Sequence, residues 1–257
     1  WDANLGVRYT RDEKDFSNYV YPTQSPVLGN RAALGFSTPE GALKDSKTWD
    51  ELTPRAIVNY HPSADTLLFG SVTTGYKSGG FGSFGITPPS VYGQTEATPD
   101  VYKPSSYEPE TSTSYELGYK GELFQGKTRV TANVFYYQYE DMQVNYFDGA
   151  SIKVDNVGKI DGWGYEGSIS QAVGEYLELN AGLAWFDSEA SDLTKICDGS
   201  DVCEDQSIPW APEWSGHVAL IGNYPLAEGE LFGMLAYHFQ TDQQGGWEPD
   251  RITVDGY

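Results

Sequence analysis

The sequence predicts an all-β protein, specifically an antiparallel up-and-down transmembrane β-barrel, and three observations support this fold class. Long segments alternate apolar and polar residues, aromatic residues are abundant, and no apolar run approaches the roughly 20 residues of a membrane-spanning helix. Leu177, Leu179 and Leu183, for example, alternate with Glu178 and Asn180. Because successive side chains of a strand point to opposite faces, each such segment has one face suited to lipid and one suited to a water-filled interior.

The alternation recurs along the chain and predicts about ten strands. Their approximate ranges are 2–14, 47–61, 66–78, 107–124, 127–146, 151–172, 176–189, 209–224 and 229–242, with a further start near 250. We expect one face of the sheet to carry the apolar residues Leu117, Leu179, Leu183, Leu220 and Leu235. The opposite face should carry the polar residues Glu116, Lys120, Glu178 and Asn180.

The predicted connections alternate in length. Short ones at 61–65, 124–127, 173–176 and 224–229 contain the Gly, Pro, Asp or Ser of tight turns. Long ones span about 15–46, 79–106 and 189–208. Short turns on one rim and long loops on the other are typical of outer-membrane barrels. Only the connection near Asp148 and Gly149 is short where a long loop is expected.

The composition narrows the possible partners. With 16 basic and 37 acidic residues the net charge is −21, which argues against nucleic acid, since phosphate neutralisation needs clustered Lys and Arg. The acidic excess fits soluble loops, or a vestibule that attracts cationic or metal-bearing ligands. The 19 Tyr and 7 Trp exceed the needs of an ordinary core and predict aromatic belts at two membrane interfaces.

Two cysteines, Cys197 and Cys203, lie in a polar loop rich in Gly, Asp and Ser. A close pair of this kind outside the cytosol predicts a disulfide that staples the loop. The competing interpretation is a metal site that also uses the neighbouring carboxylates. With no His nearby, zinc is disfavoured, and the spacing does not match a calcium-binding EF-hand loop. We therefore expect the disulfide and no metal site.

Nothing in the sequence predicts catalysis. His61, His217 and His238 are scattered and share no spacing with carboxylates or cysteines. No nucleophile elbow, phosphate-binding glycine loop or paired-carboxylate motif is present. We therefore expect a non-enzyme without a cofactor.

Six segments form an ordered set of motifs: 8–16, 74–81, 107–120, 134–143, 156–166 and 210–214. Segment 74–81 reads TGYKSGGF, 134–143 reads VFYYQYEDMQ, and 156–166 begins NVGK and ends GYE. Each alone is weak, but together and in this order they resemble motifs of the TonB-dependent outer-membrane receptors, of the siderophore-receptor type. The resemblance covers nearly the whole chain.

The resemblance implies a 22-stranded barrel plugged by an N-terminal domain that carries the TonB box. Residues 1–257 would then be about ten strands from the C-terminal half of that barrel domain, with the plug and both barrel ends absent. No leader peptide opens the chain, and both ends fall inside strand patterns, which agrees with a piece of a longer protein. The implied location is the bacterial outer membrane. The implied partners are its lipid and lipopolysaccharide, and the TonB energy-transducing complex, reached through the plug.

The family most often takes up a ferric siderophore, so we expect an iron chelate as the ligand. Aromatic rings give large contact areas at low entropic cost, and they attract cationic ligands. Our candidate ligand-binding residues are therefore aromatic residues in or near the long loops: Tyr76, Phe81, Phe84, Tyr92, Tyr107, Trp210 and Trp247. The alternatives are a receptor of the same family for cobalamin, haem, glycan or a nickel chelate, and a passive porin or structural barrel.

Overall fold

The computed structural model describes residues 1–18, 24–25, 29–30, 43–86, 104–147, 152–156, 158–193, 206–246 and 252–257. All regular secondary structure in these ranges is β-strand. Within the same ranges, no helix has the length and apolar character needed to cross a membrane.

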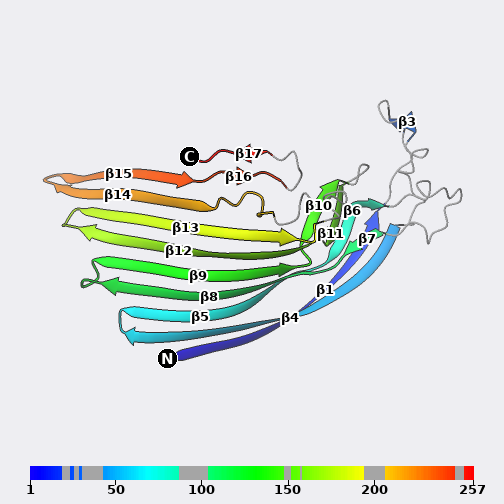
Figure 1. Ribbon diagram of the computed structural model, residues 1–257, viewed down its shortest axis with the longest axis horizontal. Coiled ribbons are helices and arrows are strands. Elements are labelled where there is room, and N and C mark those ends of the chain that lie inside the picture. The colour runs from blue at the N-terminus through cyan, green and yellow to red at the C-terminus, as the bar shows by residue number, and fades with distance from the viewer. Residues whose placement is uncertain are drawn as a thin grey trace.

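Nine long strands form one antiparallel sheet among the described residues, in the order β1-β4-β5-β8-β9-β12-β13-β14-β15 (Figure 1). Neighbours in this sheet are also neighbours along the chain, apart from short strands in the loops, so the predicted meander is confirmed. Their bounds are β1 (Asp2–Asn18), β4 (Leu43–Ser63), β5 (Thr66–Lys77), β8 (Glu110–Leu123), β9 (Thr128–Glu140), β12 (Lys159–Val173), β13 (Leu177–Ser191), β14 (Trp214–Leu226) and β15 (Gly229–Gln240).

The remaining strands pair in sequence order as β2 (Gln24–Ser25) with β3 (Gly29–Asn30), β6 (Gly80–Ile86) with β7 (Pro104–Tyr107), β10 (Gln143–Phe147) with β11 (Ile152–Asn156), and β16 (Gln243–Gln244) with β17 (Thr253–Val254). In Figure 1, β6, β7, β10 and β11 lie at one end of the long strands, and the short turns lie at the other end. We call these ends the loop rim and the turn rim. The predicted alternation of connection lengths is thus confirmed.

Three of the predicted strands differ from the structure in more than a few terminal residues. The predicted start near 250 corresponds to β17, which pairs with β16 outside the nine-stranded sheet. The segments 127–146 and 151–172 each contain two elements, because β9 stops at Glu140 and β12 starts at Lys159, where these two residues pair. Asp141 and Gly158 have φ of 54° and 72°, left-handed conformations that interrupt both strands. The connection between β9 and β12 therefore runs through the separate β10–β11 hairpin and is a long loop, not the short one predicted.

The register places the two predicted sets of residues on opposite faces of the sheet. Residues paired directly across antiparallel strands point to the same side. Leu179 pairs with Leu220, and Leu220 pairs with Leu235. On the other face Lys120 pairs with Thr131, whose row continues through Ser168 and Gly182 toward Asn180 and Glu178. We call these the apolar face and the polar face.

The apolar face is exposed rather than packed against a second layer. Leu117 and Leu235 are 65% and 75% exposed. Only Trp49, Ile160, Ala190 and Leu193 are buried hydrophobic residues in the described part of the chain. A sheet that leaves its large aliphatic side chains uncovered suits a lipid surrounding, not a water-soluble sandwich.

Two rows of aromatic residues border the apolar face. Toward the loop rim, Trp163 lies 4.5 Å from Trp185 between ring centroids, and Trp185 lies 6.3 Å from Trp214. Toward the turn rim, Tyr176 lies 4.9 Å from Tyr224. The nine residue-to-residue steps from Tyr176 to Trp185 span about 30 Å of strand at about 3.4 Å per step. At a tilt of about 40° this gives an apolar band about 23 Å tall, close to that of outer-membrane barrels.

Candidate functional site

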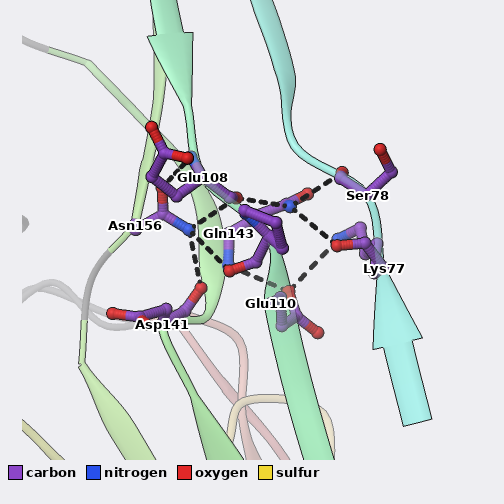
Figure 2. Close-up of polar contacts among 8 residues, drawn as sticks. Lys77, Ser78, Glu108, Glu110, Asp141, Gln143 and Asn156 are labelled. Atoms are coloured by element: carbon purple, nitrogen blue, oxygen red, sulfur yellow. Dashed lines mark hydrogen bonds and ion pairs between the residues drawn. The ribbon is translucent and has the colours of Figure 1, made fainter. Parts of the chain in front are cut away.

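Seven residues at the loop rim form a connected set of polar contacts, which we call the loop-base network (Figure 2). They come from the ends of strands that border two loops, the loop between β5 and β8 and the loop between β9 and β12. The members are Lys77, Ser78, Glu108, Glu110, Asp141, Gln143 and Asn156.

Asn156 is the most connected side chain of this network. Its Oδ1 accepts a hydrogen bond from the backbone N–H of Glu108 at 2.5 Å. Its Nδ2 donates to the backbone carbonyls of Glu108 and Asp141, both at 2.8 Å, and of Pro109 at 3.5 Å. One amide thereby joins the end of β11 to the start of β8 and the end of β9.

Gln143 extends the network to β5. Its Nε2 donates to the carbonyl of Ser78 at 3.0 Å and to that of Glu108 at 3.0 Å. Its backbone N–H donates to Glu110 Oε2 at 2.9 Å, and the same oxygen lies 3.3 Å from Lys77 Nζ. The residues of the sequence motifs therefore meet in space, and here they hold the loop bases together.

A second group of residues at the loop rim combines rings with cations. It comprises Lys14, Phe16, Lys47, Trp49 and Phe81, and we call it the aromatic–lysine cluster. In the β1–β4 register Lys14 pairs with Lys47, and Trp49 lies two positions along on the same polar face. The Nζ atoms of Lys14 and Lys47 lie 5.6 Å and 5.4 Å from the Trp49 ring. Two like charges opposite each other are thus offset by a shared cation–π partner.

The β6–β7 hairpin is fastened to this cluster. Phe81 lies 5.3 Å from Phe16 and 5.9 Å from Trp49 between ring centroids. Lys14 Nζ donates to the carbonyl of Gly79 at 2.5 Å. A Cβ on Gly79 would lie 2.5 Å from Trp49 Nε1, so glycine is needed for the close approach.

Glu108 links the two groups. It accepts a hydrogen bond from Trp49 Nε1 at 3.1 Å and forms an ion pair with Lys47. The hydrogen bond from Lys47, helped by that from Trp49, lowers the pKa of the Glu108 carboxyl below its ordinary value, although partial desolvation opposes the shift. At neutral pH Glu108 is therefore an anion that fixes both Lys47 and Trp49.

The structure brings some of the predicted ligand residues together and separates others. Phe81 lies in the aromatic–lysine cluster, and Tyr107 is on the same hairpin, paired with Gly80. Tyr76 is nearby on β5, where its hydroxyl donates to Asp12 Oδ2 at 3.3 Å. Trp210 lies apart and is 59% exposed. Its backbone N–H donates a hydrogen bond to the carbonyl of Gln244.

The other predicted positions are not tested. Phe84 belongs to β6, but its side chain is outside the described residues, as are Tyr92 and Trp247. Cys197 and Cys203 also lie outside them, so the disulfide stays a prediction.

Sequence reasoning missed Trp49, Phe16 and the two lysines of the cluster. A usable signal was present, because Phe16 and Trp49 fall at polar-face positions of their strands, where a wet lumen gives a large ring no partner. An aromatic residue out of phase with its strand therefore indicates a local contact, here with the β6–β7 hairpin.

A compact apolar group covers part of the polar face beside the loop rim. Ile160, Ala190 and Leu193 are its buried centre, and Tyr137, Tyr139, Met142 and Ile208 pack against them. Residues 206–208, which precede β14, lie against this group, since Ala190 bridges to Gln206 and the backbone N–H of Ile208 donates to Ser188 Oγ at 3.0 Å. The interior is thus partly filled at this level.

The view of the histidines as scattered is wrong for two of them. His217 and His238 are paired directly across β14 and β15, a relationship that their separation in sequence hides. In the described part of the chain, no group of three or more His, Cys, Asp or Glu residues is arranged to hold a metal ion. The expectation of no metal site stays a prediction.

Comparison with known proteins agrees with this geometry. Residues 1–257 match the family model described as TonB dependent receptor-like, beta-barrel. The chain is 26% identical over 191 residues to the ferric-pyoverdine M114 receptor PbuA of Pseudomonas sp. (strain M114), an alignment that covers 70% of this chain and 20% of that receptor. The chain thus spans about a fifth of the length of this curated relative.

Solved structures share the fold. The ferric yersiniabactin uptake receptor FyuA from Yersinia pestis superposes with a TM-score of 0.70 at 19% identity, over 99% of this chain and 34% of that one. The siderophore receptor PiuA from Acinetobacter baumannii gives 0.66 at 16% identity, over 99% and 33%. The family and these neighbours are receptors and transporters rather than enzymes. From the match over its whole length, the chain belongs to the TonB-dependent receptor family and is a part of the family's β-barrel.

Proposed function

We propose that the protein containing this chain is an outer-membrane receptor that captures a scarce, bulky iron chelate, a ferric siderophore, and imports it with energy from the TonB complex. This chain supplies a section of the barrel wall and the bases of the loops that face the ligand. The apolar face with its two aromatic rows contacts outer-membrane lipid and lipopolysaccharide. TonB acts through a plug domain that lies outside this chain.

The observation that carries the proposal is the aromatic–lysine cluster. Phe81 and Phe16 are half-buried and keep ring surface exposed, and the buried Trp49 packs against Phe81. Lys14 and Lys47 place two positive charges beside these rings in a chain whose net charge is −21. Rings next to cations suit a chelate that combines flat aromatic or amide groups with negative charge. The cluster also lies at the loop rim, where an external ligand arrives first.

The printed names of the relatives support the same ligand class. The pyoverdine and yersiniabactin receptors take up ferric chelates according to their names, and PiuA is named a siderophore receptor. Low identity leaves the particular chelate open, because the loops that select it are the least similar parts of such proteins.

The test uses a deletion strain of the parent gene grown under iron limitation on a panel of ferric chelates. We expect growth to fail on one chelate while uptake of small nutrients is unaffected, since a plugged barrel conducts too little for abundant solutes. If the deletion strain instead loses growth on cobalamin, haem or an oligosaccharide, and on no iron chelate, the proposed substrate is wrong while the family assignment is unaffected. Loss of small-solute permeability instead would favour a porin.

Complementation then connects the phenotype to the cluster. Phe81→Ala should weaken binding of the chelate about ten- to a hundredfold, the usual value of an aromatic anchor. Phe232→Ala is the matched control, because Phe232 is also on the polar face but is exposed near the turn rim. If both variants bind the chelate equally well, the aromatic–lysine cluster is not part of the ligand site.

A further inference from the structure

A pair of imidazoles lies on the polar face near the last strands of the sheet. His217 of β14 and His238 of β15 are direct cross-strand partners. Their ring centroids are 5.8 Å apart, with 29° between the ring planes. Residues at opposed antiparallel positions have Cα atoms about 4.5–5.5 Å apart, so both side chains can reach one point above the sheet.

Within the described residues of this chain, His217 is half-buried and His238 is exposed. The pair borders a hollow of about 430 Å³ on the polar face, to which Asn133, Glu166 and Gln240 also contribute. His217 packs against Gly182, where a Cβ would lie 2.5 Å from the imidazole Cε1, so glycine makes room for the ring. Within the described residues neither imidazole has a hydrogen-bond or ion-pair partner.

Two imidazoles in this arrangement have a clear chemical use. Imidazole nitrogen is a good ligand for Cu²⁺, Ni²⁺ and Zn²⁺, and Cu²⁺ binds most tightly among the divalent first-row ions. The acidic charge of the chain raises the local concentration of cations. A purely structural role explains the pair poorly, because His238 is exposed and a stacked pair in water contributes little stability.

We propose that His217 and His238 together bind a divalent transition-metal ion on the polar face, with Cu²⁺ preferred. Two protein ligands leave the other coordination positions to water, to Glu166 across the hollow, or to donors that an incoming chelate retains. This site is separate from the aromatic–lysine cluster and does not depend on which iron chelate the receptor imports.

The experiment uses the full-length receptor, purified in detergent with any affinity tag removed, and Cu²⁺ alone as the probe. Cu²⁺ is titrated against a competing chelator, and electron paramagnetic resonance reports the nitrogen ligands. The wild type should bind Cu²⁺ with two imidazole nitrogens. His217→Gln and His238→Gln should each weaken this binding about a hundredfold, because two-point attachment is lost.

His61→Gln is the matched control, since His61 lies near the turn rim and contacts Asp2 at 3.3 Å. It should bind like the wild type. Chemical modification of the wild type gives a second readout without any variant, because Cu²⁺ should protect His217 and His238, but not His61, from an imidazole-acylating reagent. Unchanged affinity in His217→Gln and His238→Gln, or no protection, overturns the proposal. Growth on the iron chelate is scored separately, so the failure of one proposal is distinguishable from failure of the other.

Discussion

Asn156 and Glu108, 48 residues apart in sequence, exchange two hydrogen bonds through a single side-chain amide. The Glu108 N–H donates to Asn156 Oδ1 at 2.5 Å, and Asn156 Nδ2 donates to the Glu108 carbonyl at 2.8 Å. The amide thereby imitates a neighbouring strand at a point where the backbone ladder has stopped. It satisfies the backbone groups of Glu108, just before β8 begins at Glu110 and joins the main sheet.

This relationship predicts the effect of Asn156→Asp. The substitution keeps the shape but removes the donors and places a carboxylate oxygen against the carbonyls of Glu108 and Asp141. The loop base should lose about 2–3 kcal/mol of local stability. Hydrogen exchange at the Glu108 and Gln143 amides should accelerate accordingly. Asn145→Asp, at an exposed position of β10, is the control and should leave exchange unchanged; equal exchange in both variants would contradict the role assigned to Asn156.

Gly164 is predicted to be intolerant of any side chain. A Cβ there would collide with the carbonyl oxygen of Trp185 and would lie 2.8 Å from Phe135 Cζ. Gly164→Ala should therefore cost about 1–3 kcal/mol, as overpacking does. Gly233→Ala on β15 meets nothing within 4 Å and should be neutral. Urea unfolding of the folded barrel in detergent measures both, and a neutral Gly164→Ala would mean that the strands can shift.

The assignment of faces predicts opposite outcomes for two adjacent arginine substitutions. Leu220 is on the apolar face between the two aromatic rows, so Leu220→Arg should cost about 2–4 kcal/mol in a bilayer. Ala219 pairs with Asn180 on the polar face, and Ala219→Arg should be tolerated. Folding yields into lipid vesicles give the comparison. A larger penalty at 219 than at 220 would reverse the faces.

Glu108 predicts a pH dependence at the loop rim. Its folded-state pKa is below the ordinary 4.5, so its contribution to stability is complete above that value and is lost as the pH falls through the folded pKa. Pepsin cleavage near the β6–β7 hairpin should therefore increase in the wild type as the pH is lowered below about 4.5. Glu108→Gln should be more susceptible than the wild type at pH 5 and equal to it at the lowest pH. Glu13→Gln, on an exposed position of β1, should behave like the wild type throughout.

Strands and faces could be predicted because alternation is a local property of the sequence. The face of the sheet that Leu117, Leu179 and Leu220 occupy can be predicted from their immediate neighbours in the sequence. The turn at Phe124–Lys127 contains residues that favour a chain reversal. Where alternation continued through a break, prediction failed. Asp141 and Gly158 interrupt β9 and β12 by backbone conformation alone, while the polar–apolar pattern continues on both sides.

The sites were harder to predict because they depend on register. Lys47 meets Glu108, and His217 meets His238, only after each strand has paired with its neighbour at one offset. Alternation fixes which face a residue occupies but not which residue lies opposite it. The motif residues Gln143 and Asn156 stood out in the sequence, yet their partners are mostly backbone atoms, which no residue pattern reveals.

The loop-base network has a consequence for how such a receptor can change. The loop between β9 and β12 carries Gln143 near its start and Asn156 near its end, and both side chains are hydrogen-bonded within the loop-base network. The base of the loop therefore has anchor points of its own. Doubling the length of such a loop adds only about 0.6 kcal/mol of closure entropy. Loop segments from other receptors can then be exchanged between these anchor points. New ligand-recognition loops can thus be acquired without changes to the barrel wall.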